Sequence, residues 1–208
     1  MAPRKSSRTS AEATVTAPPT AEAASEGSAD YKPVFFWREY GSEHGYLSQW
    51  YLSPFTAEDK SIVYQTAEQY MMYQKAILFN DPEIAAKILE TTTPKAQKAL
   101  GRKVKNFNEH IWLANRERIV EEGTYYKFKY GRGEGEGEEG DAPGLKNKLL
   151  GIGHREIVEA SPMDRIWGVG FGEKNAESRR KDWGLNLLGK ALMKVRERLI
   201  AEDKAEKA

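Results

Sequence analysis

The chain contains no cysteine among its 208 residues, which excludes several kinds of chemistry at once. Without thiols there can be no disulfide, no thiolate nucleophile and no zinc site built on thiolates. Three scattered histidines, His44, His110 and His154, lack the spacing of a metal site, so we expect no metal. No G-x-G-x-x-G motif follows a strand pattern, which argues against a dinucleotide-dependent dehydrogenase, and we expect no cofactor.

Long apolar runs and an excess of one charge are missing as well. No apolar stretch is long enough to span a bilayer, and the N-terminus lacks the apolar core of a secretory signal. We therefore expect a soluble protein of a reducing compartment, cytoplasmic or nuclear, with no membrane partner. Lys and Arg (32) nearly balance Asp and Glu (31), for a net charge of +1. This balance argues against a general polyanion binder, although it is compatible with a basic pocket for one or two phosphates. It does not indicate an oligomeric state.

Composition divides the chain into a long patterned region and several atypical stretches. Residues 1–30 are rich in Ala, Ser, Thr and Pro and are predicted to form a disordered tail. Residues 31–203 are predicted to form a single helix-rich α+β domain. Within it, residues 131–144 are almost entirely Gly and acidic residues, which predicts a flexible insertion. Residues 204–208 are predicted to form a short C-terminal tail.

Start and stop signals predict most of the helices. Asp81-Pro82 and Thr93-Pro94 each combine a capping side chain with a proline at the first helical position. Glycines are expected to end the second of these helices at 101, a longer helix over 108–122, and a short one beginning at 145. The final helix lies within 183–200 and is expected to bury Leu188, Leu192, Val195 and Leu199. Strands are expected over 34–39 and shortly before 160.

The stretch "IVYQTAEQYMMYQKAILF", residues 62–79, predicts one amphipathic helix with two charges on its apolar face. Thr66 and Gln69 have the spacing of a capping box. Glu68 and Lys75 share a face with Met71, Met72, Leu78 and Phe79. One interpretation is that Glu68 is an acid that offsets the helix dipole and that Lys75 extends to solvent. Both can equally be site residues, and the pattern alone leaves the choice open.

The segment "EASPMDRIWGVG", residues 159–170, places charged residues among glycines and an indole. Glycines at 168 and 170 would let a planar group approach the ring of Trp167 closely. Arg165 could meet a phosphate, and Asp164 could hold a hydroxyl or stabilise a cation. The alternative is an ordinary strand and turn with a buried tryptophan.

Seven segments occur together in an order that resembles the NADAR family, which includes the YbiA-like proteins of riboflavin biosynthesis. They are "LSQWY", "EQYMMYQKA", "LGRKV", the helix with Trp112, "KF" at 127–128, "EASPMDRIWGVG" and "WGLNLLGKALM". The resemblance implies a YbiA-like fold. The chain departs from the family in its N-terminal tail, in the insertion at 131–144, and in Ile152-Gly153, where a Thr-Gly pair is expected.

The resemblance also implies hydrolysis of a bond between ribose C1 and nitrogen. Some members are similar to N-glycosidases that split phosphoribosylamino-pyrimidine intermediates of riboflavin synthesis. Others look like hydrolases that remove ADP-ribose from guanine, which reverses a nucleic-acid modification and would serve DNA repair. Matching to the family and the reading of residues 159–170 give catalytic residues Glu68, Lys75 and Asp164, and substrate-binding residues Trp50, Arg102, Trp112, Arg165, Trp167, Gly168 and Asn186.

These residue types suit that chemistry. Breaking a ribosyl C–N bond develops positive charge on the sugar, which a carboxylate stabilises, and the leaving base needs a proton. Lys75 could act as a nucleophile that forms a ring-opened imine, or as an electrostatic anchor. We expect removal of ADP-ribose from guanine in a nucleotide or nucleic acid, with the phosphoribosyl substrate as the alternative. A non-catalytic module that binds ADP-ribose or NAD is the alternative of another class, but it would need no acid and amine in one site.

Overall fold

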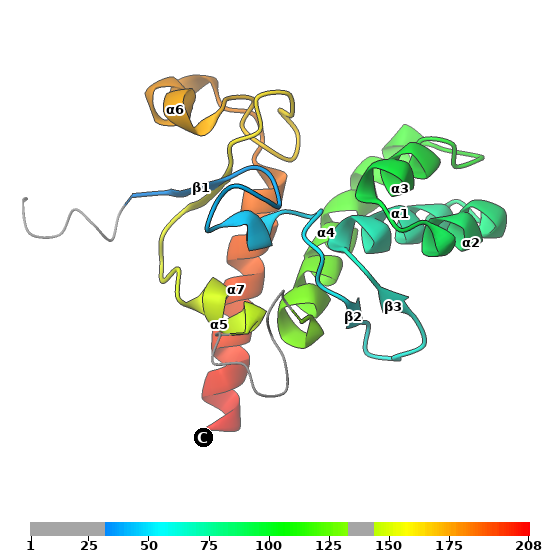
Figure 1. The fold of residues 1–208 in the computed structure, drawn as a ribbon, viewed down its shortest axis with the longest axis horizontal. Coiled ribbons are helices and arrows are strands. Elements are labelled where there is room, and N and C mark those ends of the chain that lie inside the picture. The colour runs from blue at the N-terminus through cyan, green and yellow to red at the C-terminus, as the bar shows by residue number, and fades with distance from the viewer. Residues whose placement is uncertain (1–31, 133–143) are drawn as a thin grey trace, which may run out of the picture.

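The computed structural model describes residues 32–132 and 144–208. The predicted tail at 1–30 and nearly all of the predicted insertion at 131–144 lie outside these residues. Over the described part, helices predominate and the strands form two small two-stranded sheets (Figure 1). The predicted helix-rich α+β class is therefore confirmed. No helix within 32–132 or 144–208 combines the length and apolar character needed to cross a membrane.

A parallel strand pair joins the beginning of the described chain to its last third. β1 (Val34–Phe36) pairs with β4 (Ile157–Glu159), and the Ala160 N–H extends the pairing by donating to the Phe36 carbonyl at 2.7 Å. β1 is shorter than the predicted strand at 34–39, because the chain turns away after Phe36. Since parallel strands end at the same edge, the segments after β1 and β4 leave side by side.

The stretch at 62–79 is a strand followed by a helix, not one helix. β3 (Val63–Tyr64) pairs antiparallel with β2 (Phe55–Thr56), and α1 (Ala67–Leu78) follows. Thr66 caps α1 as predicted, accepting from the Gln69 N–H at 3.1 Å. The Gln69 side chain departs from the capping box, because its oxygen accepts from the N–H of Gln65 at 2.7 Å, one residue earlier than expected.

Two short helices pack against α1, and both begin where the sequence predicts. α2 (Pro82–Glu90) is capped by Asp81, and α3 (Pro94–Gly101) is capped by Thr93 and ends at the expected glycine. Gln69 of α1 donates to the carbonyls of Ile88 and Leu89 at the end of α2, at 3.0 and 3.2 Å. These bonds satisfy terminal carbonyls of α2 and fix the two helices together.

α4 (Glu109–Tyr130) is longer than predicted, because it continues through Gly123. A Cβ atom at Gly123 would lie 2.5 Å from the Tyr70 ring. This glycine therefore permits close packing of α1 on α4 and does not end the helix. α5 (Leu145–Leu150) is the predicted short helix, capped by Gly151.

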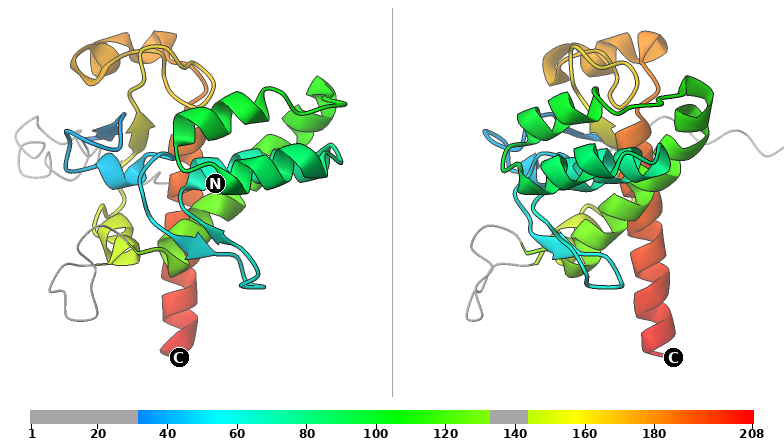
Figure 2. Two further views of the ribbon diagram at one scale, coloured as in Figure 1. Left: turned by 45° about the vertical axis from the view of Figure 1, so that its right-hand side comes forward. Right: turned by 90° about the vertical axis from the view of Figure 1, so that its right-hand side faces the viewer.

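α7 (Leu187–Glu206) is the long final helix and packs against α4 and β4. All four residues predicted for its inner face are buried. The helix continues to Glu206, so residues 204–206 extend it and do not form a tail. Before it come α6 (Glu173–Ala176) and the 3-10 helix η3 (Glu177–Asp182). α1, α2 and α3 run across the direction of α7, as Figure 2 shows.

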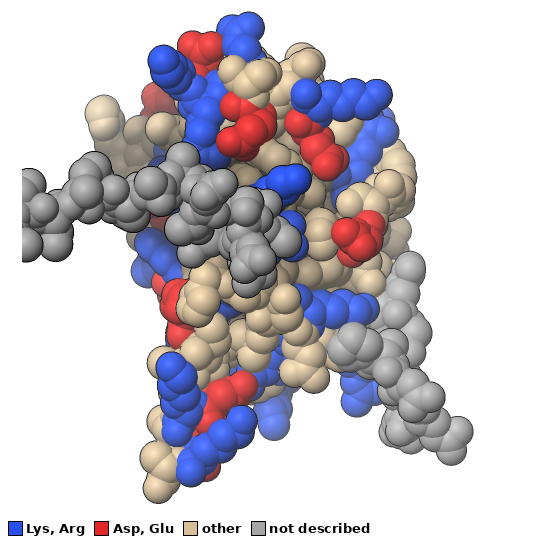
Figure 3. Space-filling view, turned by 90° about the vertical axis from the view of Figure 1, so that its left-hand side faces the viewer, with Lys and Arg blue, Asp and Glu red and all other residues tan. Residues whose placement is uncertain are grey.

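Charges of both signs are interspersed over the face shown in Figure 3, with Lys and Arg beside Asp and Glu at both its ends. This distribution agrees with the net charge of +1. The face carries no extended field of one sign among its described residues.

Candidate active site

A cavity of about 580 Å³ opens where α1, α3 and α4 meet the carboxyl ends of the parallel strands. Its walls come from residues 37–40 after β1, residues 48–50 after the 3-10 helix η2 (Gly45–Leu47), residues of α1, α3, α4 and α7, and residues 159–167. Its volume falls within the usual range for small-molecule sites.

Two glutamates, Glu68 buried and Glu159 partly buried, face this cavity, each with an unsatisfied oxygen. Glu68 is 5% exposed, and its Oε1 has no hydrogen-bond partner among the described residues; the same holds for Oε2 of Glu159. Burial raises the pKa of Glu68 to about 7, although Lys98 and the side chain of Trp50 oppose the rise. Burial also raises the pKa of Glu159 to about 8, and the nearby carboxylates of Asp164 and Glu68 raise it further. The pair is therefore able to hold a proton near neutral pH.

Asn186 holds Glu159 in place from behind the cavity. Its side-chain oxygen accepts from the Glu159 N–H at 3.0 Å, and its amide donates to the Ile157 carbonyl at 3.0 Å. Asn186 takes a left-handed conformation, with φ of 49°, at the start of α7. It is 5% exposed and does not line the cavity, so its observed contacts are those of a positioning residue.

Asp164 is fixed by the loop that carries it. Its Oδ1 accepts from the N–H groups of Ile166 and Trp167, both at 2.8 Å, which leaves Oδ2 for other contacts. Gly168 lets this loop lie on the end of β4, because a Cβ there would lie 2.7 Å from the Glu159 carbonyl oxygen. The glycine thus brings Asp164 close to Glu159, whereas we expected it to open a path for a ligand.

Trp50 forms one wall of the cavity, and a buried lysine holds the backbone that leads to it. The Glu68 N–H donates to the Gln49 carbonyl at 3.0 Å, which ties this wall to the start of α1. Lys127 of α4 is 1% exposed and donates to the carbonyls of Tyr46 and Ser48 at 2.6 and 2.7 Å. Burial lowers the pKa of Lys127 to about 7.

Trp167 forms a second aromatic wall. The guanidinium of Arg116, from α4, lies 5.9 Å from the centre of its ring, and Nε of Arg116 is buried without a hydrogen-bond partner among the described residues. Trp167 is partly exposed, so ring surface remains available in the cavity. Two aromatic walls and a polar floor suit a planar, polar ligand.

Two cations from α3 complete the lining. Lys98 and Arg102 both face the cavity, and neither forms an ion pair with a described residue. Gly101 allows this approach, because a Cβ there would lie 2.1 Å from the Met72 sulfur. The end of α3 therefore packs directly on α1 and brings Arg102 to the cavity.

Lys75 lies beside the cavity but is not among the residues that line it. Its Nζ donates to the Gly101 carbonyl at 2.8 Å and lies 4.4 Å from the centre of the Phe107 ring and 5.3 Å from that of Trp112. Burial lowers the pKa of Lys75, and the neighbouring charge of Arg102 lowers it further. The amine is therefore easier to deprotonate than an exposed lysine, one helical turn from Met71 and Met72 of the cavity wall.

The structure brings together half of the predicted site residues. Trp50, Glu68, Arg102, Asp164 and Trp167 line the cavity, whereas Lys75, Trp112, Arg165, Gly168 and Asn186 do not. Arg165, which we expected to meet a phosphate, does not line the cavity, and its guanidinium donates to the Asp182 carbonyl at 2.6 Å. Trp112 packs against the core, with its ring centre 5.3 Å from Lys75 Nζ.

Several lining residues were not predicted, and Glu159 is the most important of them. A carboxylate directly after two apolar residues of a predicted strand was an available signal. For Lys98, the sequence offers no signal beyond its position one helical turn before Arg102. Within 32–132 and 144–208, no group of His, Asp and Glu side chains has the arrangement of a metal site.

The fold is similar to that of the Escherichia coli protein YbiA, solved by NMR, with a TM-score of 0.60 at 22% identity. The match covers 83% of this chain and 87% of that one. Fold and site together define a helix-rich α+β domain with an acid-lined cavity between aromatic walls.

Family membership follows from the sequence match. Residues 35–200 match the NADAR domain, and the chain belongs to the NADAR family. A relative from Acanthamoeba polyphaga mimivirus, named as an N-glycosidase, is 39% identical over 80% of this chain and 95% of its own length. Another relative named as an N-glycosidase, from Nostoc punctiforme, is 29% identical over 78% of this chain and 88% of its own length.

Proposed function

We propose that the protein is an N-glycosidase that hydrolyses a ribosyl C1–N bond, and that its substrate is guanine carrying ADP-ribose. The observation that carries this proposal is the pair of glutamates, Glu68 and Glu159, with unsatisfied oxygens and raised pKa values beside Asp164 in one cavity. Two relatives named as N-glycosidases support the reaction class.

The carboxyl groups have separate roles in cleaving the C1–N bond. As the C1–N bond breaks, its electron pair moves to the nitrogen, which takes a proton from the Glu68–Glu159 pair. The Asp164 carboxylate stabilises the positive charge that develops at the sugar. An oxygen of water then bonds to C1, and the water proton returns to the glutamate pair. The products are the free base and a sugar with a hydroxyl at C1.

The other lining residues hold the substrate during this reaction. Trp167 and Trp50 offer ring faces to the base, and one stacked base contributes roughly 1–3 kcal/mol. Lys98 and Arg102 supply positive charge for a phosphate, and Arg102 offers a guanidinium that can bind two oxygens at once.

Lys75 gives a second route to the same products. Its amine, with a lowered pKa, attacks C1 as the C1–N bond to the base breaks, and the base takes a proton from the Glu68–Glu159 pair. The sugar ring then opens to an imine, and water hydrolyses this imine to release the sugar and restore the amine. This route requires Lys75 Nζ to break its hydrogen bond to the Gly101 carbonyl and to contact the substrate instead. The direct route uses Lys75 only as a positive charge beside Arg102.

A chromatographic hydrolysis assay tests the proposal. A short oligonucleotide with ADP-ribosylated guanine is incubated with the wild type, with Glu159→Gln, and with Glu117→Gln as an exposed acid on α4 outside the cavity. We expect unmodified guanine from the wild type and the control but not from Glu159→Gln.

A parallel assay on a phosphoribosylamino-pyrimidine separates the alternatives. Cleavage of that compound alone would retain the reaction class and replace the substrate. Cleavage of neither compound would contradict the enzyme proposal and favour a binding module.

A further inference from the structure

We propose that Trp37, Arg38 and Tyr40 form a platform at the cavity mouth that receives the adenine ring of an ADP-ribosyl substrate. We call these three residues the rim platform. This inference rests on the proposed function, and it names the part of the site that would distinguish an ADP-ribosyl from a phosphoribosyl substrate.

The platform exposes aromatic surface next to a cavity, which is unusual for a folded domain. Trp37 is 41% exposed and Tyr40 is 61% exposed, yet both line the cavity. Met163, which also lines it, is 92% exposed. Single exposed apolar residues need no explanation, but three around one opening indicate a contact surface for a ligand.

The platform is held in a defined arrangement. The Arg38 guanidinium lies 4.2 Å from the centre of the Trp37 ring and 5.6 Å from that of Tyr40, and it donates to the Tyr40 hydroxyl at 2.8 Å. The backbone beneath is tightly packed, because a Cβ at Gly45 would lie 2.6 Å from the Glu39 carbonyl oxygen. Little ordering of these side chains would therefore be needed on binding.

The position of the platform matches a ligand with two ring systems. Trp50 and Trp167 form an aromatic site beside the carboxylates, and the platform is a second aromatic site on the same cavity. Arg38, Lys98 and Arg102 all line this cavity and provide positive charge for a linking diphosphate. An ADP-ribosyl group supplies the second ring and the diphosphate, whereas a phosphoribosyl group has no second ring.

Equilibrium binding tests the platform without involving the chemical step. Titration calorimetry measures the affinities of ADP-ribose and ribose 5-phosphate for the wild type, Trp37→Ala and Tyr40→Ala. Tyr130→Ala, at a 39% exposed tyrosine outside the cavity, is the matched control. We expect each platform variant to bind ADP-ribose about 10-fold more weakly, in line with the loss of one stacked ring. Ribose 5-phosphate should bind equally to all four proteins.

The other outcomes separate the two proposals. If the wild type prefers ADP-ribose and both platform variants keep that preference, the platform is overturned and the proposed substrate stands. If the wild type binds both compounds equally, the platform and the ADP-ribosyl substrate are overturned together. A loss of affinity for both compounds in a platform variant would indicate a general structural role and would also overturn the inference.

Discussion

The burial of Glu68 has a structural cost, and our proposal gives this residue a chemical role. A carboxyl group that is buried with an unsatisfied oxygen is costly when ionised, and its pKa of about 7 reflects that cost. At pH values between 4.5, the usual pKa of a glutamate, and about 7, Glu68 in the folded protein holds a proton that it has lost in the unfolded chain. The contribution of Glu68 to folding stability therefore falls as the pH rises through this window.

Glu68→Gln should remove both the cost and the activity. We expect the variant to equal the wild type in stability near pH 4 and to exceed it near pH 8, by up to about 3 kcal/mol. Hydrolysis should fall by about 10²- to 10⁴-fold, because an amide cannot donate the proton. Urea unfolding at the two pH values and the hydrolysis assay measure these effects. A variant that is less stable than the wild type at pH 8 would show that the ionised Glu68 carboxylate does not lower the folding stability at that pH.

Lys75 can be assigned to one of its two roles by Lys75→Arg. The arginine keeps the charge and can still donate to the Gly101 carbonyl, but it cannot form an imine. If the amine is the nucleophile, turnover of Lys75→Arg falls to background while ADP-ribose binding is kept. Trapping with borohydride should then link substrate to the wild type only. Full turnover in the variant would leave Lys75 as an electrostatic anchor.

At the scale of elements, α4 connects the core to the cavity. It packs on α1 at Gly123, supplies Lys127 to the segment before Trp50, and places Arg116 over Trp167. This one helix therefore contacts both the core and the two aromatic walls of the cavity.

Gly123→Ala should destabilise the protein even though alanine favours helices. The new Cβ would lie 2.5 Å from the Tyr70 ring, which is 3% exposed and has little room to move. We expect a loss of about 1–3 kcal/mol, the usual result of overpacking a core, measured by urea unfolding. Gly151→Ala, where the nearest atom would lie at 3.2 Å, provides a milder control at a helix end. An increase in stability for Gly123→Ala would mean that propensity outweighs packing.

The elements that could be predicted are those fixed by local signals. Asp81 and Thr93 each cap their helix through the next few residues, so the sequence is enough. The prediction that Gly123 ends its helix was wrong, because the role of this glycine depends on Tyr70, which is distant in the sequence. β3 was missed because Val63 and Tyr64 form a strand only by pairing with β2.

The residues of the candidate site also divide into those marked by local signals and those placed by distant contacts. Glu68 was found because a charge on an apolar helical face is a local anomaly. Glu159 was missed because its place depends on the pairing of β4 with β1 and on the side chain of Asn186. Family resemblance supplied Trp50 and Arg102, which no local pattern would have selected.

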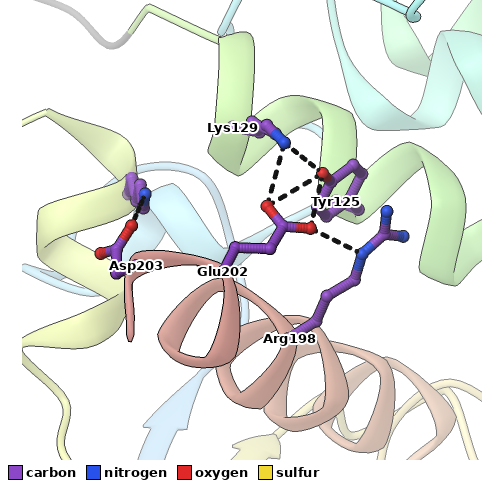
Figure 4. Close-up of polar contacts among 6 residues, drawn as sticks. Tyr125, Lys129, Arg198, Glu202 and Asp203 are labelled. Carbon is purple, nitrogen blue, oxygen red and sulfur yellow. Dashed lines mark hydrogen bonds and ion pairs between the residues drawn. The ribbon is translucent and has the colours of Figure 1, made fainter. Parts of the chain in front are cut away.

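For the whole molecule, the two long helices are joined far from the cavity by a polar network (Figure 4). Glu202 of α7 accepts from the Tyr125 hydroxyl at 2.9 Å, from Lys129 at 2.9 Å and from Arg198 at 3.0 Å. The Arg198 guanidinium also lies 3.5 Å from the centre of the Tyr125 ring. These contacts fix the last turns of α7 to the end of α4.

Glu202→Ala should lower stability and spare the reaction. Three donors lose their shared acceptor at a partly exposed site, so we expect a loss of about 1–2 kcal/mol by urea unfolding. Hydrolysis should be unchanged, since Glu202 does not line the cavity. Glu206→Ala, at an exposed acid on the same helix, is the control. Equal stability of Glu202→Ala and the wild type would show that the network adds no net stability.

The parallel pairing of β1 with β4 also sets the order in which the protein can assemble during translation. Trp37 and Tyr40 leave the ribosome before α1 to α5, whereas Glu159, Asp164 and Trp167 follow only after these helices have been synthesised. Because β4 must reach β1 before these groups meet, a nascent chain that ends before Glu159 can form helices but not the candidate site. The growing polypeptide therefore completes the candidate site only after β4 and residues 160–167 have been synthesised.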